Sequence, residues 1–334
     1  MPAAAIEVEG LTKRYGANGV EALKGVTFDV QPGEVFGYLG RNGAGKSTTV
    51  RILTTLIRPT AGGARVAGFD VRTQPREVRR ALGAALQEAA LDELMTGREH
   101  LTLAGRLAGR TKADARARAG ELLQTFGLTA AADRVAATYS GGMRRRLDVA
   151  MAMVRRPTVL FLDEPTTGLD PQGRRALWTL IRDLRNEGSA VFLTTQYLAE
   201  ADELSDRVAV VHDGRIAAIG PQDELKARLG TTAIRLRVST GGVERMRYAF
   251  APDELKVDDD GWITLTVAGG EAGVPATVAG LISAGIQIVR LEVRPPTLED
   301  VFVNLTGTAI EAAPGGGSNM ALAAVRRGMG RPAP

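Results

Sequence analysis

The stretch Gly40-Arg41-Asn42-Gly43-Ala44-Gly45-Lys46-Ser47-Thr48 fits the pattern GxxxxGK followed by Ser or Thr, and it decides the fold class of this 334-residue chain. It follows the strand-like run Val35–Leu39 and opens a helical pattern, which is the setting that the motif requires. The alternative, a plain glycine-rich turn with a surface lysine, does not require a strand before it and a helix after it. Glycines let backbone N–H groups converge on phosphate oxygens, and the helix N-terminus adds a positive dipole end. We therefore predict a loop in which Lys46 reaches the β- and γ-phosphates and Ser47 binds Mg²⁺. The residues predicted to contact the nucleotide here are Gly40, Asn42, Gly43, Gly45, Lys46, Ser47 and Thr48.

A second candidate segment is the apolar run Val159–Asp163, which ends in two acids because Glu164 follows Asp163 directly. Buried strands seldom end in adjacent carboxylates unless a cationic or polar group meets them. After a phosphate loop, Asp163 suits the organisation of Mg²⁺ and Glu164 suits the polarisation of an attacking water. Alone the pair is a weak signal, since any strand can run into an acidic loop.

A third segment, Tyr139-Ser140-Gly141-Gly142-Met143, precedes a long helical pattern. Ser140 is a natural N-cap, and the two glycines leave the first N–H groups of the helix open to an anion. By itself the segment favours a plain serine-capped helix, because Ser is among the commonest N-caps. The three arginines that follow, Arg144–Arg146, are interpreted as a solvated helix face.

Short β-rich runs alternate with helical patterns over residues 1–229, which predicts an α/β domain with a largely parallel, buried sheet and an antiparallel strand group beside it. The pattern between about residues 88 and 157 is helical throughout, and it predicts a helical insertion in which a capping box at Thr111 and Asp114 opens a helix that runs to Phe126. The predicted strands are Val26–Val30, Val35–Leu39, Ala64–Ala67, Val159–Asp163, Ala190–Thr194 and Val208–Val211.

Residues 233–307 predict a small α+β domain, most simply a ferredoxin-like one. Alternating apolar residues at 234–238 and 263–267 indicate half-buried strands, and a helix near 276–284 and a strand at 286–293 follow them. A capping box at Thr297 and Asp300 opens a last helix, whose apolar face is Leu298, Val301, Phe302 and Leu305. The Gly/Ser/Pro-rich residues 308–334 predict a flexible tail.

Composition excludes some chemistries. The chain has no cysteine, so disulfides, thiolate metal sites and cysteine nucleophiles are absent. Its 42 basic and 38 acidic residues give a net charge of +4, which does not indicate nucleic-acid binding. No run approaches the roughly 18 apolar residues of a transmembrane helix, and no secretory signal is predicted at the N-terminus.

The order of these motifs, completed by Thr167-Gly168-Leu169-Asp170, resembles the ABC ATPase family over about residues 6–229. The resemblance implies a P-loop NTPase fold with ATP and Mg²⁺ as cofactors. It also implies a head-to-tail dimer of two copies, with each ATP between the phosphate loop of one copy and Ser140, Gly141 and Gly142 of the other. Tyr15 matches the aromatic residue that stacks on adenine, with a buried core tyrosine as the alternative. Gln87 matches the glutamine that contacts Mg²⁺ or water, and Asp170 matches the loop that links the two ATP sites.

Two positions depart from the family pattern. Met143 stands where glutamine is more usual, and Gln196 stands where the family's switch histidine should follow the strand Ala190–Thr194. An amide can donate a hydrogen bond to the γ-phosphate but cannot carry a proton. We therefore expect Glu164 to activate water while Gln196 only positions the phosphate.

Gln196, the Gly142-Met143 pair and the segment Pro296–Phe302 together resemble the daunorubicin-resistance type of ATP-binding subunit, to about residue 307. This resemblance implies an ATPase at the cytoplasmic face of the membrane that powers export of drugs, antibiotics or lipids through a separate polytopic permease. By analogy, the C-terminal domain would be regulatory or would stabilise the dimer.

Two other classes stay open. A soluble ABC ATPase acting on nucleic acid or ribosomes would usually carry two ATPase domains or a long coiled coil, and the sequence has neither; we expect no nucleic-acid partner. A nucleotide-binding regulator without turnover would have no use for the Asp163–Glu164 pair.

Overall fold

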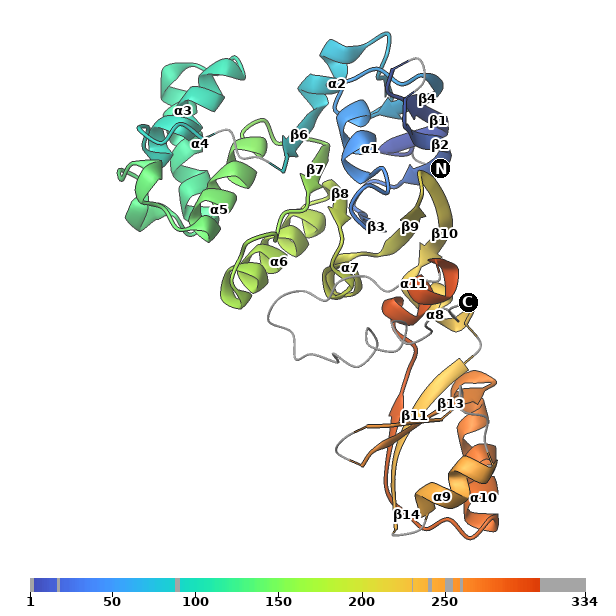
Figure 1. Cartoon of the computed structure of the whole chain (residues 1–334). Helices are drawn as coiled ribbons and strands as arrows, with labels where there is room; N and C mark the ends of the chain where they lie inside the picture. The colour runs from blue at the N-terminus through green and yellow to red at the C-terminus, as the bar shows by residue number, and fades with distance from the viewer. Residues whose placement is uncertain are drawn as a thin grey trace, which may run out of the picture.

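The structure is a computed structural model that describes residues 3–16, 19–87, 91–229, 231–239, 242–249, 255–258 and 261–306. The predicted tail, residues 308–334, lies outside the described residues, as do residues 88–90 of the predicted helical insertion. In Figure 1 a helical group lies at the upper left, an α/β core lies beside it, and a small sheet with its own helices lies at the bottom.

The central sheet forms the predicted α/β core. Its strand order is β10-β9-β3-β8-β7-β6, and all neighbours from β9 to β6 run parallel. Every residue of β3, β7 and β8 is buried, as expected for strands covered on both faces. Parallel strands end at the same edge, so the residues that follow them meet there. The strands are β3 (Val35–Gly40), β6 (Leu82–Ala85), β7 (Val159–Asp163), β8 (Ala190–Thr195), β9 (Arg207–His212) and β10 (Arg215–Pro221).

An antiparallel sheet, β2-β1-β4-β5, packs beside the central sheet as the sequence predicted. Stacked and tilted rings of Phe28, Phe36, Tyr38 and Phe192, with centroids 5.4–5.9 Å apart, fill the space between the two sheets. Helix α1 (Lys46–Leu53) buries Val50, Ile52 and Leu53 in the same core. The strands are β1 (Ile6–Arg14), β2 (Glu21–Val30), β4 (Ala61–Val66) and β5 (Phe69–Asp70), and α2 (Pro75–Ala81) follows them.

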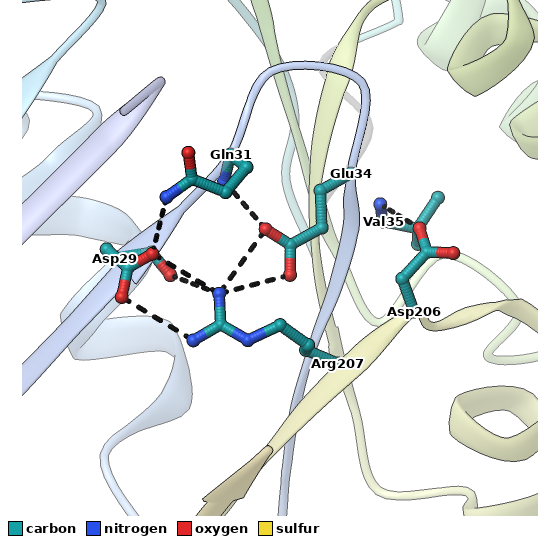
Figure 2. A network of polar contacts seen from close by, with 6 residues as sticks. All are labelled: Asp29, Gln31, Glu34, Val35, Asp206 and Arg207. Carbon is teal, nitrogen blue, oxygen red and sulfur yellow. Dashed lines mark hydrogen bonds and ion pairs between the residues drawn. The ribbon is translucent and has the colours of Figure 1, made fainter. Parts of the chain in front are cut away.

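Figure 2 shows how charged residues fix the start of β3, at the end of the strand remote from the phosphate loop. Arg207, at the start of β9, lies 3.3 Å from carboxylate oxygens of both Asp29 and Glu34. Asp206 accepts the Val35 N–H at 2.8 Å. Burial raises the pKa of the Glu34 carboxyl, whereas bonds from Gln31 and Arg207 outweigh burial at Asp29 and lower the pKa of that carboxyl.

The helical group contains α3 (Gly97–Leu107), α4 (Lys112–Thr125) and α5 (Gly141–Ala152). Thr111 caps α4, and its hydroxyl accepts the Asp114 N–H as predicted. The region is not wholly helical, because Thr96 and Val135 form an isolated β-bridge. The core of this group continues into α6 (Pro171–Asn186) and α7 (Leu198–Leu204), which cover the face of the central sheet opposite α1.

The third sheet has the order β12-β13-β11-β14 with all neighbours antiparallel. Its β-α-β-β-α-β succession is that of the predicted ferredoxin-like fold, although α9 and β12 were not predicted. The elements are β11 (Thr231–Val238), α9 (Gly242–Ala249), β12 (Leu255–Val257), β13 (Ile263–Ala268), α10 (Val274–Ser283) and β14 (Ile288–Arg294).

The last helix, α11 (Leu298–Thr306), packs away from this third sheet. Its Leu298, Val301 and Phe302 are buried in a cluster with Leu39, Ala201 and Leu225, which belong to residues 3–229, here called the first unit. Helix α8 (Gln222–Ala227) packs in the same cluster. Leu305 is exposed, so its place in the predicted apolar face is wrong. The capping box itself is present, because Thr297 N–H donates to Asp300 and Asp300 N–H donates to the Thr297 hydroxyl.

Candidate functional site

The phosphate loop joins β3 to α1 and requires glycine at two of its positions. Gly43 and Gly45 have φ values of +83° and +105°, a region that L side chains rarely adopt. A Cβ on Gly45 would also lie 2.7 Å from the Ala22 carbonyl oxygen. Lys46 is buried, and its Nζ donates to the carbonyl oxygens of Gly40 and Arg41 at 2.8 and 3.2 Å.

The two predicted carboxylates lie beside this loop. The Ser47 Oγ is 3.5 Å from Asp163 Oδ1, and the Lys46 Nζ is 3.1 Å from Glu164 Oε1. Glu164 has a φ of +47°, which is unusual for a residue with a Cβ. Its N–H donates to the carbonyl and hydroxyl oxygens of Thr194, and the same hydroxyl contacts Asp163 Oδ1.

A cavity of about 270 Å³ opens above the phosphate loop. Gln196, which follows β8, lines it together with the tip of the loop. The turn after β9 also lines the cavity, and it is joined to the loop because Gly214 N–H donates to the Ala44 carbonyl at 3.2 Å. The lining residues are Arg41, Asn42, Gly43, Ala44, Gln196, His212 and Asp213.

Tyr15 and Gln87, two further predicted site residues, are both exposed. Tyr15 is 42% exposed, so the alternative of a buried core tyrosine is wrong, and its hydroxyl lies 3.4 Å from the Thr48 hydroxyl. Gln87 is exposed and follows β6, the strand next to β7. Both side chains are therefore open to a nucleotide or a partner.

The Ser140–Gly142 turn does not line the cavity at the phosphate loop of its own chain. Ser140 is exposed and caps α5, since its hydroxyl accepts the Met143 N–H at 3.3 Å. A Cβ on Gly141 would lie 3.8 Å from the Gly168 carbonyl oxygen, so the turn is next to the loop that ends at Asp170. Asp170 caps α6 by accepting the Gly173 N–H at 3.0 Å.

The interpretation of Arg144–Arg146 as a solvated face is wrong for Arg145. Its side chain is 9% exposed and pairs with Asp148 at 2.8 Å. Burial lowers the pKa of the Arg145 guanidinium and raises the pKa of Asp148 to about 6, although Arg145 opposes the second shift. Arg144 and Arg146 are only half-buried; Arg144 forms an ion pair with the exposed Glu93, and Arg146 donates to the Phe126 carbonyl.

The donor set fits a magnesium nucleotide. The Ser47 hydroxyl and the Asp163 carboxylate are hard oxygen donors side by side, the kind that Mg²⁺ prefers when it also binds phosphate. Lys46 supplies a cation at the base of a loop whose glycines adopt φ values that expose backbone N–H groups.

Comparison with known proteins agrees with this geometry. The profile of the family described as ABC transporter matches residues 23–167, and one for the DrrA1-3-like C-terminal domain of ATP-binding proteins matches residues 220–306. The chain is 46% identical over 311 residues, 92% of its length, to the daunorubicin/doxorubicin resistance ATP-binding protein DrrA of Streptomyces peucetius, of which 93% is covered. This chain belongs to the ABC transporter ATP-binding family. Within it, the chain is of the daunorubicin/doxorubicin-resistance type.

Other family members extend the comparison. The linearmycin resistance ATP-binding protein LnrL of Bacillus subtilis is 34% identical over 318 residues, covering 91% of this chain and 99% of LnrL. A solved ATP-binding subunit of an ABC transporter superimposes with a TM-score of 0.62 at 32% identity, over 68% of this chain and 93% of that one. A dimeric cassette with ADP and Pi superimposes with a TM-score of 0.60 at 25% identity, over 65% and 98%.

These findings make the chain an ATPase whose hydrolysis is coupled to transport, with the P-loop ABC ATPase fold that the sequence predicted. It is a subunit of a membrane transporter, and ABC cassettes of its fold form dimers. In the part of the chain that the structure describes, no helix has the length and apolarity to cross a bilayer.

The sequence did not predict every residue at the site, and Thr194, His212 and Arg145 are examples. Thr194 contacts both carboxylate positions, His212 shares the cavity with Gln196, and the buried Arg145 donates to the Asp163 carbonyl. Thr194 and His212 stand at the carboxyl ends of β8 and β9, which flank β3, so the rule that ligands bind at this edge could have found them. Nothing in the run of three arginines distinguishes Arg145 from its neighbours.

Proposed function

We propose that this chain hydrolyses ATP at Lys46 and Glu164 to power export of an apolar, drug-like compound through a separate membrane permease. The observation that carries the proposal is the 3.1 Å contact between Lys46 Nζ and Glu164 Oε1. It brings the phosphate loop and the acidic end of β7, which are far apart in the sequence, to one point. A regulator without turnover would not require this proximity.

Each residue has a role that follows from its position. Lys46 and the loop N–H groups bind the β- and γ-phosphates, and Ser47 and Asp163 hold Mg²⁺, which neutralises charge on the phosphates when bound. Glu164 accepts a proton from the attacking water. Gln196, which lines the cavity, donates a hydrogen bond to the γ-phosphate. Gln87 contacts Mg²⁺ or the water.

The complete site needs a second copy of the chain. Ser140, Gly141 and Gly142 are exposed or half-buried at a helix N-terminus, and they do not line the cavity of their own subunit. In a head-to-tail dimer they meet the γ-phosphate of ATP on the partner, while Tyr15 stacks on adenine and Asp170 links the two sites. A solved cassette of the same fold is dimeric, which supports the pairing of two copies.

The permease and its substrate follow from the relatives. DrrA is named for daunorubicin and doxorubicin resistance and LnrL for linearmycin resistance, so members of this type serve chemically different compounds. The permease therefore contains the substrate contacts, and this chain sits on it at the cytoplasmic face. No observation favours the alternative of an ATPase acting on nucleic acid.

The test uses the chain expressed together with its permease in membrane vesicles. Glu164→Gln should lower kcat for ATP hydrolysis by about 100-fold or more, the usual contribution of a general base, and abolish drug accumulation. Glu187→Gln, at an exposed glutamate after α6, is the matched control and should leave both unchanged. Hydrolysis by Glu164→Gln at the rate of the unaltered chain would refute the role of Glu164.

The same preparation tests the dimer. Glu164→Gln with ATP should trap two copies together, and replacing Ser140 by Arg should prevent this without weakening ATP binding to the monomer. If ATP fails to bring two copies together even when the permease is present, the head-to-tail arrangement is wrong.

A further inference from the structure

Arg145 extends into the junction of three chain segments. From α5, its Nη1 donates to the Leu86 carbonyl at 2.6 Å, its Nη2 to the Asp163 carbonyl at 2.9 Å and its Nε to the Pro165 carbonyl at 3.0 Å. Nη1 also meets the Asp148 carboxylate at 2.8 Å. A single buried guanidinium therefore joins α5 to the ends of β6 and β7.

The acceptors of Arg145 flank residues of the candidate site. Leu86 directly precedes Gln87, while Asp163 and Pro165 stand on either side of Glu164. A left-handed backbone such as that of Glu164 costs about 1–2 kcal/mol for a residue with a Cβ, so the surroundings must hold it. Its N–H is bonded to Thr194, and the carbonyls before and after it are bonded to Arg145.

Only arginine can make this set of contacts. The guanidinium is planar and has five N–H donors in a rigid fork, which matches three carbonyls and one carboxylate converging from different directions. A lysine ammonium has three donors on one nitrogen and cannot reach all four acceptors from the same helix position.

We propose that Arg145 is a positioning residue for ATP hydrolysis, which holds Glu164 in its left-handed conformation toward Lys46 and the phosphate loop. Because Arg145 belongs to the helix that begins with the Ser140–Gly142 turn, a movement of α5 reorients Glu164 of the same subunit. The inference rests on the role proposed for Glu164.

The first test is Arg145→Lys, assayed in the complex with the permease. We expect kcat to fall about 100-fold, since a displacement near 1 Å can have that effect, while KM for ATP changes less than about threefold. The matched control is Arg144→Lys on the same helix, whose partners are Glu93 and the Ala137 carbonyl, away from the site. This control should keep the turnover of the unaltered chain.

A second variant separates positioning from folding. Arg145→Met combined with Asp148→Leu replaces a buried ion pair by apolar side chains, an exchange that is often neutral or stabilising. Because three carbonyls also lose their donor, the thermal midpoint should fall by several degrees, and the protein that remains folded at the assay temperature should still hydrolyse ATP as slowly as Arg145→Lys. Turnover at the level of the unaltered chain in this folded variant would overturn the proposal.

A double-mutant cycle tests the route through Glu164. In a Glu164→Gln background, Arg145→Lys should not slow the residual hydrolysis further, because the group it positions is already disabled. A further fall in kcat as large as the one that Arg145→Lys causes in the unaltered chain would contradict positioning through Glu164. If instead Glu164→Gln is as fast as the unaltered chain, the proposed function fails, and this outcome is distinct from failure at Arg145.

Discussion

The ammonium group of Lys46 lies 3.1 Å from the carboxylate of Glu164, and the two side chains are only 4% and 8% exposed. Each charge compensates the other inside the protein, next to the carbonyl oxygens of Gly40 and Arg41. The pair thus stabilises the fold in the absence of ATP, and in the proposed reaction the phosphates would compete with Glu164 for Lys46.

Removing one partner of this pair should destabilise the fold. Lys46→Met leaves the Glu164 carboxylate buried without its cation, and the free energy of unfolding should fall by about 3 kcal/mol. Adding Glu164→Gln should restore a large part of the loss, because no charge then remains unpaired. Urea unfolding without nucleotide measures both effects, and equal losses in the single and double variants would show that the pair is not coupled.

Gly45→Ala should abolish nucleotide binding and destabilise the chain. The new Cβ would meet the Ala22 carbonyl at 2.7 Å at a φ of +105°, so the loop must shift. Gly120→Ala in α4 is the matched control, since a Cβ there meets nothing within 4 Å. It should stabilise the chain by about 0.5–1 kcal/mol through helix propensity. Thermal unfolding and titration with a fluorescent ATP analogue distinguish the two variants.

Glu200→Gln should change how stability depends on pH. Burial raises the pKa of the Glu200 carboxyl above its unfolded value of 4.5, and the side chain is 1% exposed. The folded state therefore holds the proton more tightly, so its stability declines as pH rises above the unfolded pKa. The Gln variant lacks this decline, and its advantage in urea unfolding should grow from pH 4.5 upward until Glu200 ionises in the folded state. A constant difference across pH would contradict the burial of an ionisable group here.

Gln196→His should add an acidic limb to the pH profile of kcat, because imidazole titrates near neutrality and an amide does not. The variant should hydrolyse ATP at a different rate from the unaltered chain at neutral pH. Steady-state rates between pH 5.5 and 8.5, roughly the range over which an imidazole titrates, provide the measurement. An identical rate and profile would show that residue 196 does not contact the γ-phosphate.

Phe302→Ala should destabilise the ATPase core although the residue lies in the C-terminal segment. Phe302 is fully buried against the first unit, and a cavity of that size costs about 3–5 kcal/mol. Leu305→Ala on the exposed side of α11 should change stability by less than about 0.5 kcal/mol. If α11 instead served only the third sheet, Phe302→Ala would leave the thermal midpoint of the core unaltered.

The local elements were largely predictable because each depends on residues close in sequence. The continuous apolar run Val159–Leu162 predicted a buried strand, and Thr111 predicted the start of α4, since a cap and its acceptor are three residues apart. The phosphate loop is predictable for the same reason, because Gly43 and Gly45 allow the positive φ values that the loop needs.

The contacts of single side chains across elements were not predictable. The three arginines after Met143 look alike in sequence, and only the position of α5 over β6 and β7 buries Arg145 and leaves Arg144 half-buried. The apolar face of α11 correctly predicted that Phe302 is buried. It did not predict that Phe302 packs against the first unit and not against the third sheet.

The sequence by itself determined that the chain has a phosphate loop, a serine-capped glycine turn and a strand that ends in two acids. Hydrophobic periodicity, helix caps and the φ values that glycine allows all depend on residues a few positions apart. The tertiary structure decided that Lys46 meets Glu164 and that Gln196 shares a cavity with His212. These pairings depend on the order β9-β3-β8-β7 in the sheet, and strand order arises from packing between segments that are distant in the chain.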